Sequence, residues 1–224
     1  MFNTQGMTAG SGKEKPVIGT GNQKVKINSV TFDQTPYDAN AYNITLHVES
    51  EPMTGEFQGF LVDQNNPNGP RYSGQVGRVR FSPYAYKDTI LPNGNEISRD
   101  NEVMKAMVFL AETLNKRADL DKISANTIEE FMSACNSIFS NSGFVNVCLA
   151  AREWENKEGY INNDLFLPKM SKGNVPIEAL DVESSKLITF DSNNPLHLRK
   201  AVKTDAPATT SFEPTTSSAS DFDL

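Results

Sequence analysis

The segment from Phe144 to Lys169 constrains the fold most, because its pattern predicts two strands joined by a tight turn. Every second side chain from 145 to 151 is apolar, and Asn146, Cys148 and Ala150 stand between them, the pattern of a half-buried strand. Residues 155–159 have turn chemistry, and apolar positions resume from Tyr160 until Pro168 ends the ladder. The segment is therefore predicted to be a β-hairpin.

The turn of this hairpin is rich in rings and cations. Trp154 is the only tryptophan, and Arg152, Lys157 and Tyr160 lie within a few residues of it. Such side chains on an exposed hairpin can stack on unpaired bases while the cations follow the phosphates. The alternative is structural: Trp154 and Tyr160 form a cross-strand pair that caps a hydrophobic core.

Alternating apolar residues predict further strands in the first half of the chain, at residues 24–32, 42–48, 57–62 and 71–81. The alternation changes phase at Asn28-Ser29, which predicts a β-bulge that bends the first strand. Such a bend in the first strand is what a small closed barrel requires. Residues 33–40, after this strand, are predicted to be a loop.

The segment 71–87 is the densest basic and aromatic stretch of the chain. It contains Arg71, Tyr72, Arg78, Arg80, Phe81, Tyr84, Tyr86 and Lys87. Three arginines and four rings on one short segment favour nucleic-acid binding. The alternative is a solvated sheet face with ordinary aromatic packing.

Two helices are predicted before the hairpin. Ser98 is a candidate N-cap for a helix that Lys116 and Arg117 close, and Thr127 opens a second helix with capping-box spacing that ends before Gly143. With 57–62 and 71–81 taken as one split third strand, the order is three strands, helices and two strands, which is the element order of the oligonucleotide-binding (OB) fold. We therefore expect a mainly β protein with an α insertion, an OB-fold-like five-stranded barrel with helices between strands 3 and 4.

The 224 residues divide into three regions by composition. Residues 1–22 are predicted to be a flexible N-terminal arm, and residues 23–203 the folded domain, with an extension from about 170 that forms one more strand or a strap across the barrel. Residues 204–224 form an acidic C-terminal tail that is predicted to be disordered. The tail contains four acids and no base, so the net charge of -7 becomes -7 + 4 = -3 without it. These acids are Asp205, Glu213, Asp221 and Asp223.

Several classes of protein are disfavoured by what the sequence lacks. No apolar run approaches the roughly 20 residues of a membrane span, and the first residues have no signal-peptide core, so we expect a cytoplasmic protein without membrane contact. Cys135 and Cys148 are predicted to be buried free thiols. The lone His47 and His197 suggest neither a metal site nor a catalytic pair, so we expect no cofactor, no metal and no enzyme activity.

The element order over residues 24–169 and the acidic, partly apolar final residues resemble bacteriophage single-stranded-DNA-binding proteins. The resemblance implies a sequence-tolerant protein that protects single-stranded DNA in the host cytoplasm. It also implies a tail that recruits replication or recombination proteins, with Asp221, Phe222, Asp223 and Leu224 as the partner-binding residues. A homo-oligomer is compatible with the sequence.

The nucleic-acid-binding residues expected in this interpretation are Arg71, Tyr72, Arg78, Arg80, Phe81, Tyr84, Tyr86, Lys87, Arg152, Trp154, Lys157, Tyr160 and Lys169. Two other functions are weighed against it. An enzyme of nucleic-acid metabolism would need clustered carboxylates for Mg²⁺, and the acids are scattered over turns and helix caps. A virion or assembly protein, acting as a β-rich protein-interaction module, fits the net acidity and remains the alternative.

Overall fold

The computed structural model describes residues 18–51, 74–140 and 142–201 of the chain. The strands are β1 (Gly21–Thr35), β2 (Asp38–Ser50), β3 (Val76–Arg80), β4 (Thr89–Ile90), β5 (Glu96–Ile97), β6 (Phe144–Glu155), β7 (Ile161–Phe166), β8 (Ile177–Ala179) and β9 (Leu198–Arg199). The helices are α1 (Arg99–Thr113), α2 (Arg117–Leu120) and α3 (Ile128–Phe139).

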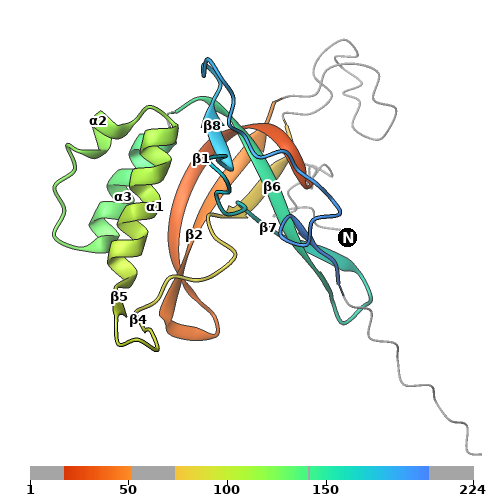
Figure 1. Ribbon diagram of the computed structural model, residues 1–224, viewed down its shortest axis with the longest axis horizontal. Coiled ribbons are helices and arrows are strands. Elements are labelled where there is room, and N and C mark those ends of the chain that lie inside the picture. Colours follow the sequence, from red (N-terminus) through yellow and green to blue (C-terminus); the bar gives the residue numbers. More distant parts are fainter. Residues whose placement is uncertain (1–17, 52–73, 141, 202–224) are drawn as a thin grey trace, which may run out of the picture.

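The protein is mainly β, with a mixed sheet of seven strands and a small hairpin of β4 and β5. The sheet order is β1-β2-β3-β7-β6-β8, β9 also pairs with β6, and β1 pairs with β6 as well as with β2. The β3–β7 and β6–β9 pairs are parallel, and the other pairs of this sheet are antiparallel. The three helices lie together on one side of the strands, and the β6–β7 hairpin projects on the other (Figure 1).

The first two strands form a long hairpin that confirms the predicted bulge. The pairing register shifts between Ile27 and Ser29, so that Val25, Ile27 and Val30 are all buried despite the change of parity. The predicted loop over residues 33–40 is wrong. β1 continues to Thr35 and β2 begins at Asp38, because the Thr35 hydroxyl closes a tight turn by donating to the Asp38 carbonyl at 2.9 Å.

β3 is shorter than the predicted strand 71–81, and the predicted strand 57–62 lies outside the described residues. Gly77 of β3 faces the core, where the side chain of Ile18 fills the space that a Cβ would need. The predicted arm of residues 1–22 therefore overlaps the folded domain, since Ile18 is buried and β1 begins at Gly21.

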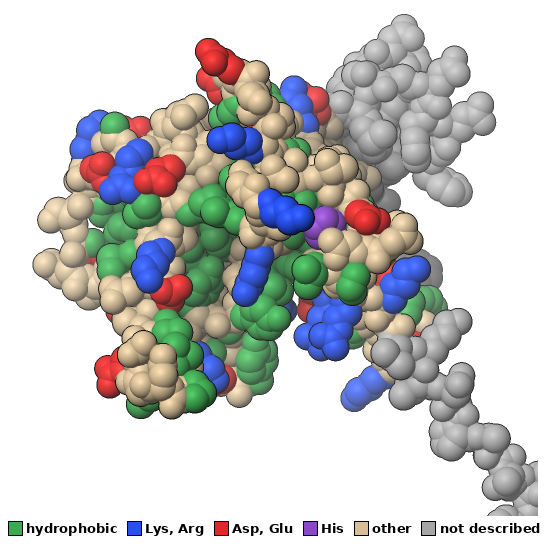
Figure 2. Space-filling model, in the orientation of Figure 1, with side chains coloured by type: hydrophobic (Ala, Val, Ile, Leu, Met, Phe, Trp, Pro, Cys, Tyr) green, Lys and Arg blue, Asp and Glu red, His purple; other side chains and the backbone are tan. Residues whose placement is uncertain are grey.

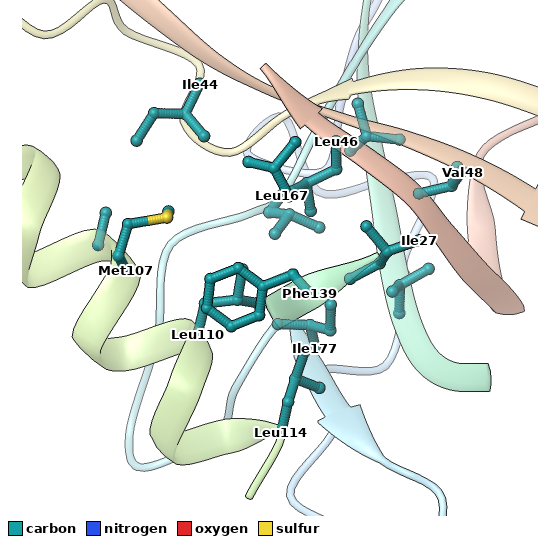
Figure 3. Close-up of a cluster of buried hydrophobic side chains, with 14 of the residues drawn as sticks. Ile27, Ile44, Leu46, Val48, Met107, Leu110, Leu114, Phe139, Leu167 and Ile177 are labelled. Atoms are coloured by element: carbon teal, nitrogen blue, oxygen red, sulfur yellow. The ribbon is translucent and has the colours of Figure 1, made fainter. Parts of the chain in front are cut away.

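The two predicted helices are confirmed as α1 and α3. Ser98 accepts a hydrogen bond from the Asn101 amide, and Thr127 accepts one from the Glu130 amide at 3.2 Å. Arg117 starts the separate short helix α2 instead of closing α1. The apolar stripes of α1 and α3 meet the strands in one core, where Met107, Leu110 and Phe139 lie beside Leu46 and Leu167 (Figure 3).

The hairpin at 144–169 is confirmed as β6 and β7, but its first strand is not half-buried. Cys148 and Ala150 are fully buried, as are their alternating neighbours. The reason lies in residues 188–197, which we call the strap. Asn22 is paired with Cys148 across the sheet, and its amide binds the strap at the Ile188 carbonyl and the Phe190 N–H, so the strap covers this face.

Residues 170–201 complete the sheet and cover it. β8 pairs with the first half of β6, and β9 pairs with its second half. The alternating piece at 187–190 is no strand: only Leu187 makes a bridge, to Val175. The expectation of one more strand or a strap is therefore met by two short strands and the strap between them.

Candidate nucleic-acid interface

The outward side of β3 carries two arginines, because strand alternation directs Val79 into the core. Arg78 and Arg80 flank Val79 and face away from the core. Arg80 is aligned with Phe166 of β7, and the outward Asp164 of β7 is aligned with Arg152 of β6. One face of three neighbouring strands thus carries cations and a ring.

Arg80, Arg152, Asp164 and Phe166 line a cavity of about 620 Å³, which we call the basic groove. Its lining includes the cations Arg80, Arg152, Lys169 and Arg199 and the rings of Tyr84 and Phe166. The strap forms the facing wall. Basic side chains gather over this part of the molecule, beside the β6–β7 hairpin (Figure 2). A cavity of this size holds a small organic ligand or a nucleotide.

The charge of the basic groove is opposite to that of the whole chain. Four cations and the single carboxylate of Asp164 line it, a formal charge of 4 - 1 = +3, whereas the chain carries -7. Arg80 and Asp164 are 3.5 Å apart and only partly exposed. The other three cations have no further carboxylate within the lining, so they remain available to an anion.

Aromatic side chains stand at the mouth of the basic groove. Tyr84 is 68% exposed, and the Lys169 ammonium lies 5.5 Å from the centroid of its ring. This cation–π contact places a ring and a positive charge together at one edge of the cavity. An exposed ring beside a cation is the combination on which an unpaired base stacks while its phosphate is neutralised.

The β6–β7 turn extends this surface beyond the cavity. Trp154 is 44% exposed and Tyr160 is 67% exposed, and Trp154 is paired with Asn162, not with Tyr160. The alternative in which these two rings pair to cap the core is therefore wrong. Trp154 lies two residues from Arg152 and on the same side of β6, and Lys157 is exposed in the turn.

Three of the expected residues lie elsewhere. Phe81 packs edge-on against Phe109 of α1, with ring centroids 6.2 Å apart, and burial next to Glu102 raises the pKa of Tyr86. Both line a second, more apolar cleft of about 410 Å³ against α1, seen as a hydrophobic hollow in Figure 2. Lys87 lies 3.8 Å from Asp38.

The remaining expected residues either flank the basic groove or cannot be placed. Arg78 is exposed on the same face of β3 but does not line the cavity. The residues that lie outside the described part of the chain are Arg71, Tyr72, Asp221, Phe222, Asp223 and Leu224.

The residues of the basic groove that were not predicted from the sequence include Phe166, Asn194, His197 and Arg199. Phe166 could have been found from parity, because Leu165 is buried and its neighbours must face outward. Arg199 belongs to a basic cluster near the end of the domain, and only the pairing of β9 with β6 brings it beside Arg152.

Among the described residues we find neither a metal-binding cluster nor a reactive thiol. They contain no group of three or more His, Cys, Asp or Glu side chains that could hold a metal ion, and none of their helices is long and apolar enough to cross a membrane. Burial raises the pKa of Cys135 to about 12 and that of Cys148 to about 11, so both are protonated thiols at neutral pH.

Comparisons with protein-family models, curated proteins and solved structures found no match to this chain. Its function is therefore inferred from the geometry and charge of the basic groove.

Proposed function

We propose that this protein binds single-stranded DNA in the basic groove. The observation that carries the proposal is a cavity with formal charge +3, lined by the exposed ring of Tyr84 and the half-buried ring of Phe166, in a chain whose net charge is -7. Charge of this sign in one place favours an anionic ligand, and the rings favour one with flat bases. The exposed rings and cations of the β6–β7 hairpin would continue the contact along the strand.

The proposal includes an OB-like barrel. In its support, the pairings β1–β2, β2–β3, β3–β7, β7–β6 and β6–β1 lead back to the first strand. In chain order these strands are β1, β2, β3, β6 and β7, so the third and fifth strands are parallel and the helices lie between the third and the fourth. OB folds bind oligonucleotides over the face of their second and third strands, between two of their loops.

Stacking and phosphate contacts would give affinity without reading most of the sequence. Each base stacked on an aromatic ring contributes roughly 1–3 kcal/mol, and Tyr84, Trp154 and Phe166 are the candidate rings. The cations would make phosphate contacts whose strength falls with salt, because binding releases counterions.

In the cell, such a protein would protect single-stranded DNA in the cytoplasm of a phage-infected host. Its acidic tail, with Asp221, Phe222, Asp223 and Leu224, would recruit replication or recombination proteins. Apolar side chains flanked by carboxylates suit a partner pocket with a basic rim.

The test is a titration of Trp154 fluorescence with an oligo-dT strand at several salt concentrations. We expect quenching that weakens steeply as salt rises. Arg152→Gln should weaken binding and reduce the slope of log affinity against log salt by about 0.7, the value for one phosphate contact on a single strand.

Lys122→Gln is the matched control, because it removes the same charge from the helical side of the molecule, where Lys122 pairs with Asp119. It should leave the salt slope unchanged. Equal effects of the two variants would argue against the basic groove as the site. Absence of binding to any oligonucleotide at low salt would overturn the proposal and favour the virion or assembly protein.

A further inference from the structure

The strap wall of the basic groove presents a hydrogen-bond donor of fixed identity at Asn194. The Oδ1 atom of Asn194 accepts a hydrogen bond from the Leu196 amide at 3.0 Å. That bond identifies the oxygen of the side-chain amide, so the nitrogen Nδ2 is the other end, with two N–H donors. Asn194 lines the cavity.

His197, which also lines the cavity, is a second donor of fixed identity. Its Nδ1 atom accepts a hydrogen bond from the Asp191 amide at 3.1 Å. A neutral imidazole that accepts at Nδ1 carries its proton on Nε2, so Nε2 is a donor. The ring is stacked on Phe190, with centroids 6.0 Å apart, which holds its orientation.

The wall that carries these donors is anchored at both ends. Asn22 of β1 binds the strap through Ile188 and Phe190, and the Ala151 amide of β6 donates to the His197 carbonyl at 2.9 Å. Donors fixed before binding lose little conformational entropy when a ligand arrives. Asp164, the carboxylate of the cavity, lies on β7 and is engaged by Arg80, whereas the strap contributes the donors of Asn194 and His197 to the lining.

We infer that the basic groove holds one nucleotide of the bound strand and selects a base whose edge offers two neighbouring acceptors. Cytosine offers N3 and O2, and guanine offers N7 and O6. Adenine and thymine place a donor next to each acceptor on these edges. The inference rests on the proposed binding of single-stranded DNA and adds one base-selective position to an otherwise sequence-tolerant contact.

The test compares short oligo-dT strands in which one central nucleotide is replaced by dC, dG or dA, with affinity measured by fluorescence anisotropy. We expect the dC strand or the dG strand to bind roughly fivefold or more tightly than all-dT, and the dA strand to match all-dT. Preference for dC would assign the N3–O2 edge, and preference for dG the N7–O6 edge. Equal affinity of all four strands would overturn the inference.

Asn194→Asp examines the donor directly. It keeps the oxygen that accepts from Leu196 and replaces the Nδ2 donor by an acceptor. The ratio of the affinity for the preferred dC or dG strand to the affinity for all-dT should therefore fall to about 1. Asn193→Asp is the matched control, because it adds the same charge one residue away and outside the lining. It should lower affinities but preserve the ratio. A ratio that survives Asn194→Asp would overturn the role of this side chain.

Failure of the proposed function and failure of the base-selective position give different results. If no strand binds, the proposed function fails. If all strands bind with a salt slope that depends on Arg152 but without base preference, the proposed function stands and the base-selective position is wrong.

Discussion

Gly77 is the residue of β3 against which the buried side chain of Ile18 packs. A Cβ there would overlap Cγ2 of Ile18, whose side chain is buried. We predict that Gly77→Ala lowers the free energy of unfolding by about 1–3 kcal/mol, the usual cost of overpacking a core. Urea denaturation measures the change.

Gly19→Ala is the control, because nothing lies within 4 Å of a Cβ at that position. It should change stability by less than about 0.5 kcal/mol. In an Ile18→Ala background, Gly77→Ala should lower the free energy of unfolding by less, because the Cγ2 atom that a Cβ at residue 77 would overlap is absent. An equal cost in both backgrounds would contradict this account of Gly77.

The two cysteines define a second residue-scale prediction. Because burial raises the pKa values of Cys135 and Cys148 to about 12 and about 11, the native protein at roughly pH 8 should not react with a disulfide reagent. Both thiols should react at once in denaturing urea. Rapid reaction of the native protein would show that one thiol is accessible, and a Cys148→Ala variant would identify which.

The same shifts link stability to pH. Folding raises both pKa values above the ordinary value of 9.0, so the folded state holds these protons more tightly than the unfolded state. The resulting contribution to stability is fully present below about pH 9 and is lost as pH rises through about 11 and about 12.

At the scale of elements, the strap depends on Asn22. The Asn22 side chain donates to the Ile188 carbonyl at 2.7 Å and accepts from the Phe190 amide at 2.8 Å. Asn22→Ala removes both bonds, each of which contributes about 0.5–1.5 kcal/mol. We predict faster hydrogen exchange at the Phe190 amide and weaker single-stranded-DNA binding, measured by exchange mass spectrometry and anisotropy.

Asn126→Ala serves as the control for the strap, since that side chain is exposed before α3. Exchange at Phe190 should stay at its wild-type rate in this variant. If Asn22→Ala accelerates exchange throughout β1 and β2 as well, the residue supports the sheet as a whole and the strap is not a separate unit.

Elements with strong local periodicity were predictable from the sequence. The β1 bulge, the two capped helices and the β6–β7 hairpin are each signalled within a short stretch of the chain. β8 and β9 have three and two residues, and their pairing with β6 depends on distant segments. The basic groove was predictable only in part for the same reason: Arg80, Arg152 and Lys169 were expected, whereas Arg199 reaches them through β9.

Neighbours in sequence are not always neighbours in space, and this limited the prediction at 78–87. Arg80 and Tyr84 line the basic groove, but Phe81 and Tyr86 lie against α1. The chain passes from the outward face of the sheet to the helical side within these few residues. The number of rings and cations in this stretch of sequence is therefore larger than the number that can contact one ligand.

At the scale of the whole molecule, charge separates into a basic groove and an acidic remainder. The groove lining carries +3 within a chain of -7, so the remainder holds -7 - 3 = -10. Long-range repulsion from that remainder opposes the approach of a polyanion, while the groove attracts it at close range. Salt should therefore weaken the repulsion and the attraction together.

Residues 207–224 contribute three of the acids, Glu213, Asp221 and Asp223, and no base. Removing them changes the net charge from -7 to -7 + 3 = -4. We predict that a chain ending at Ala206 binds oligo-dT several-fold more tightly at low salt and about equally at about 1 M salt, where the Debye length is only about 3 Å. Anisotropy titrations at both salt concentrations measure the difference.

A full-length variant with Glu213→Gln, Asp221→Asn and Asp223→Asn separates charge from chain length. Because the predicted effect is electrostatic, this variant should bind as tightly as the truncated chain at low salt. If only truncation tightens binding, the segment acts by excluding volume at the groove, and its charge is not the cause. If neither change alters affinity at low salt, the acids lie too far from the bound strand, beyond about 10 Å at about 0.1 M salt, to influence it.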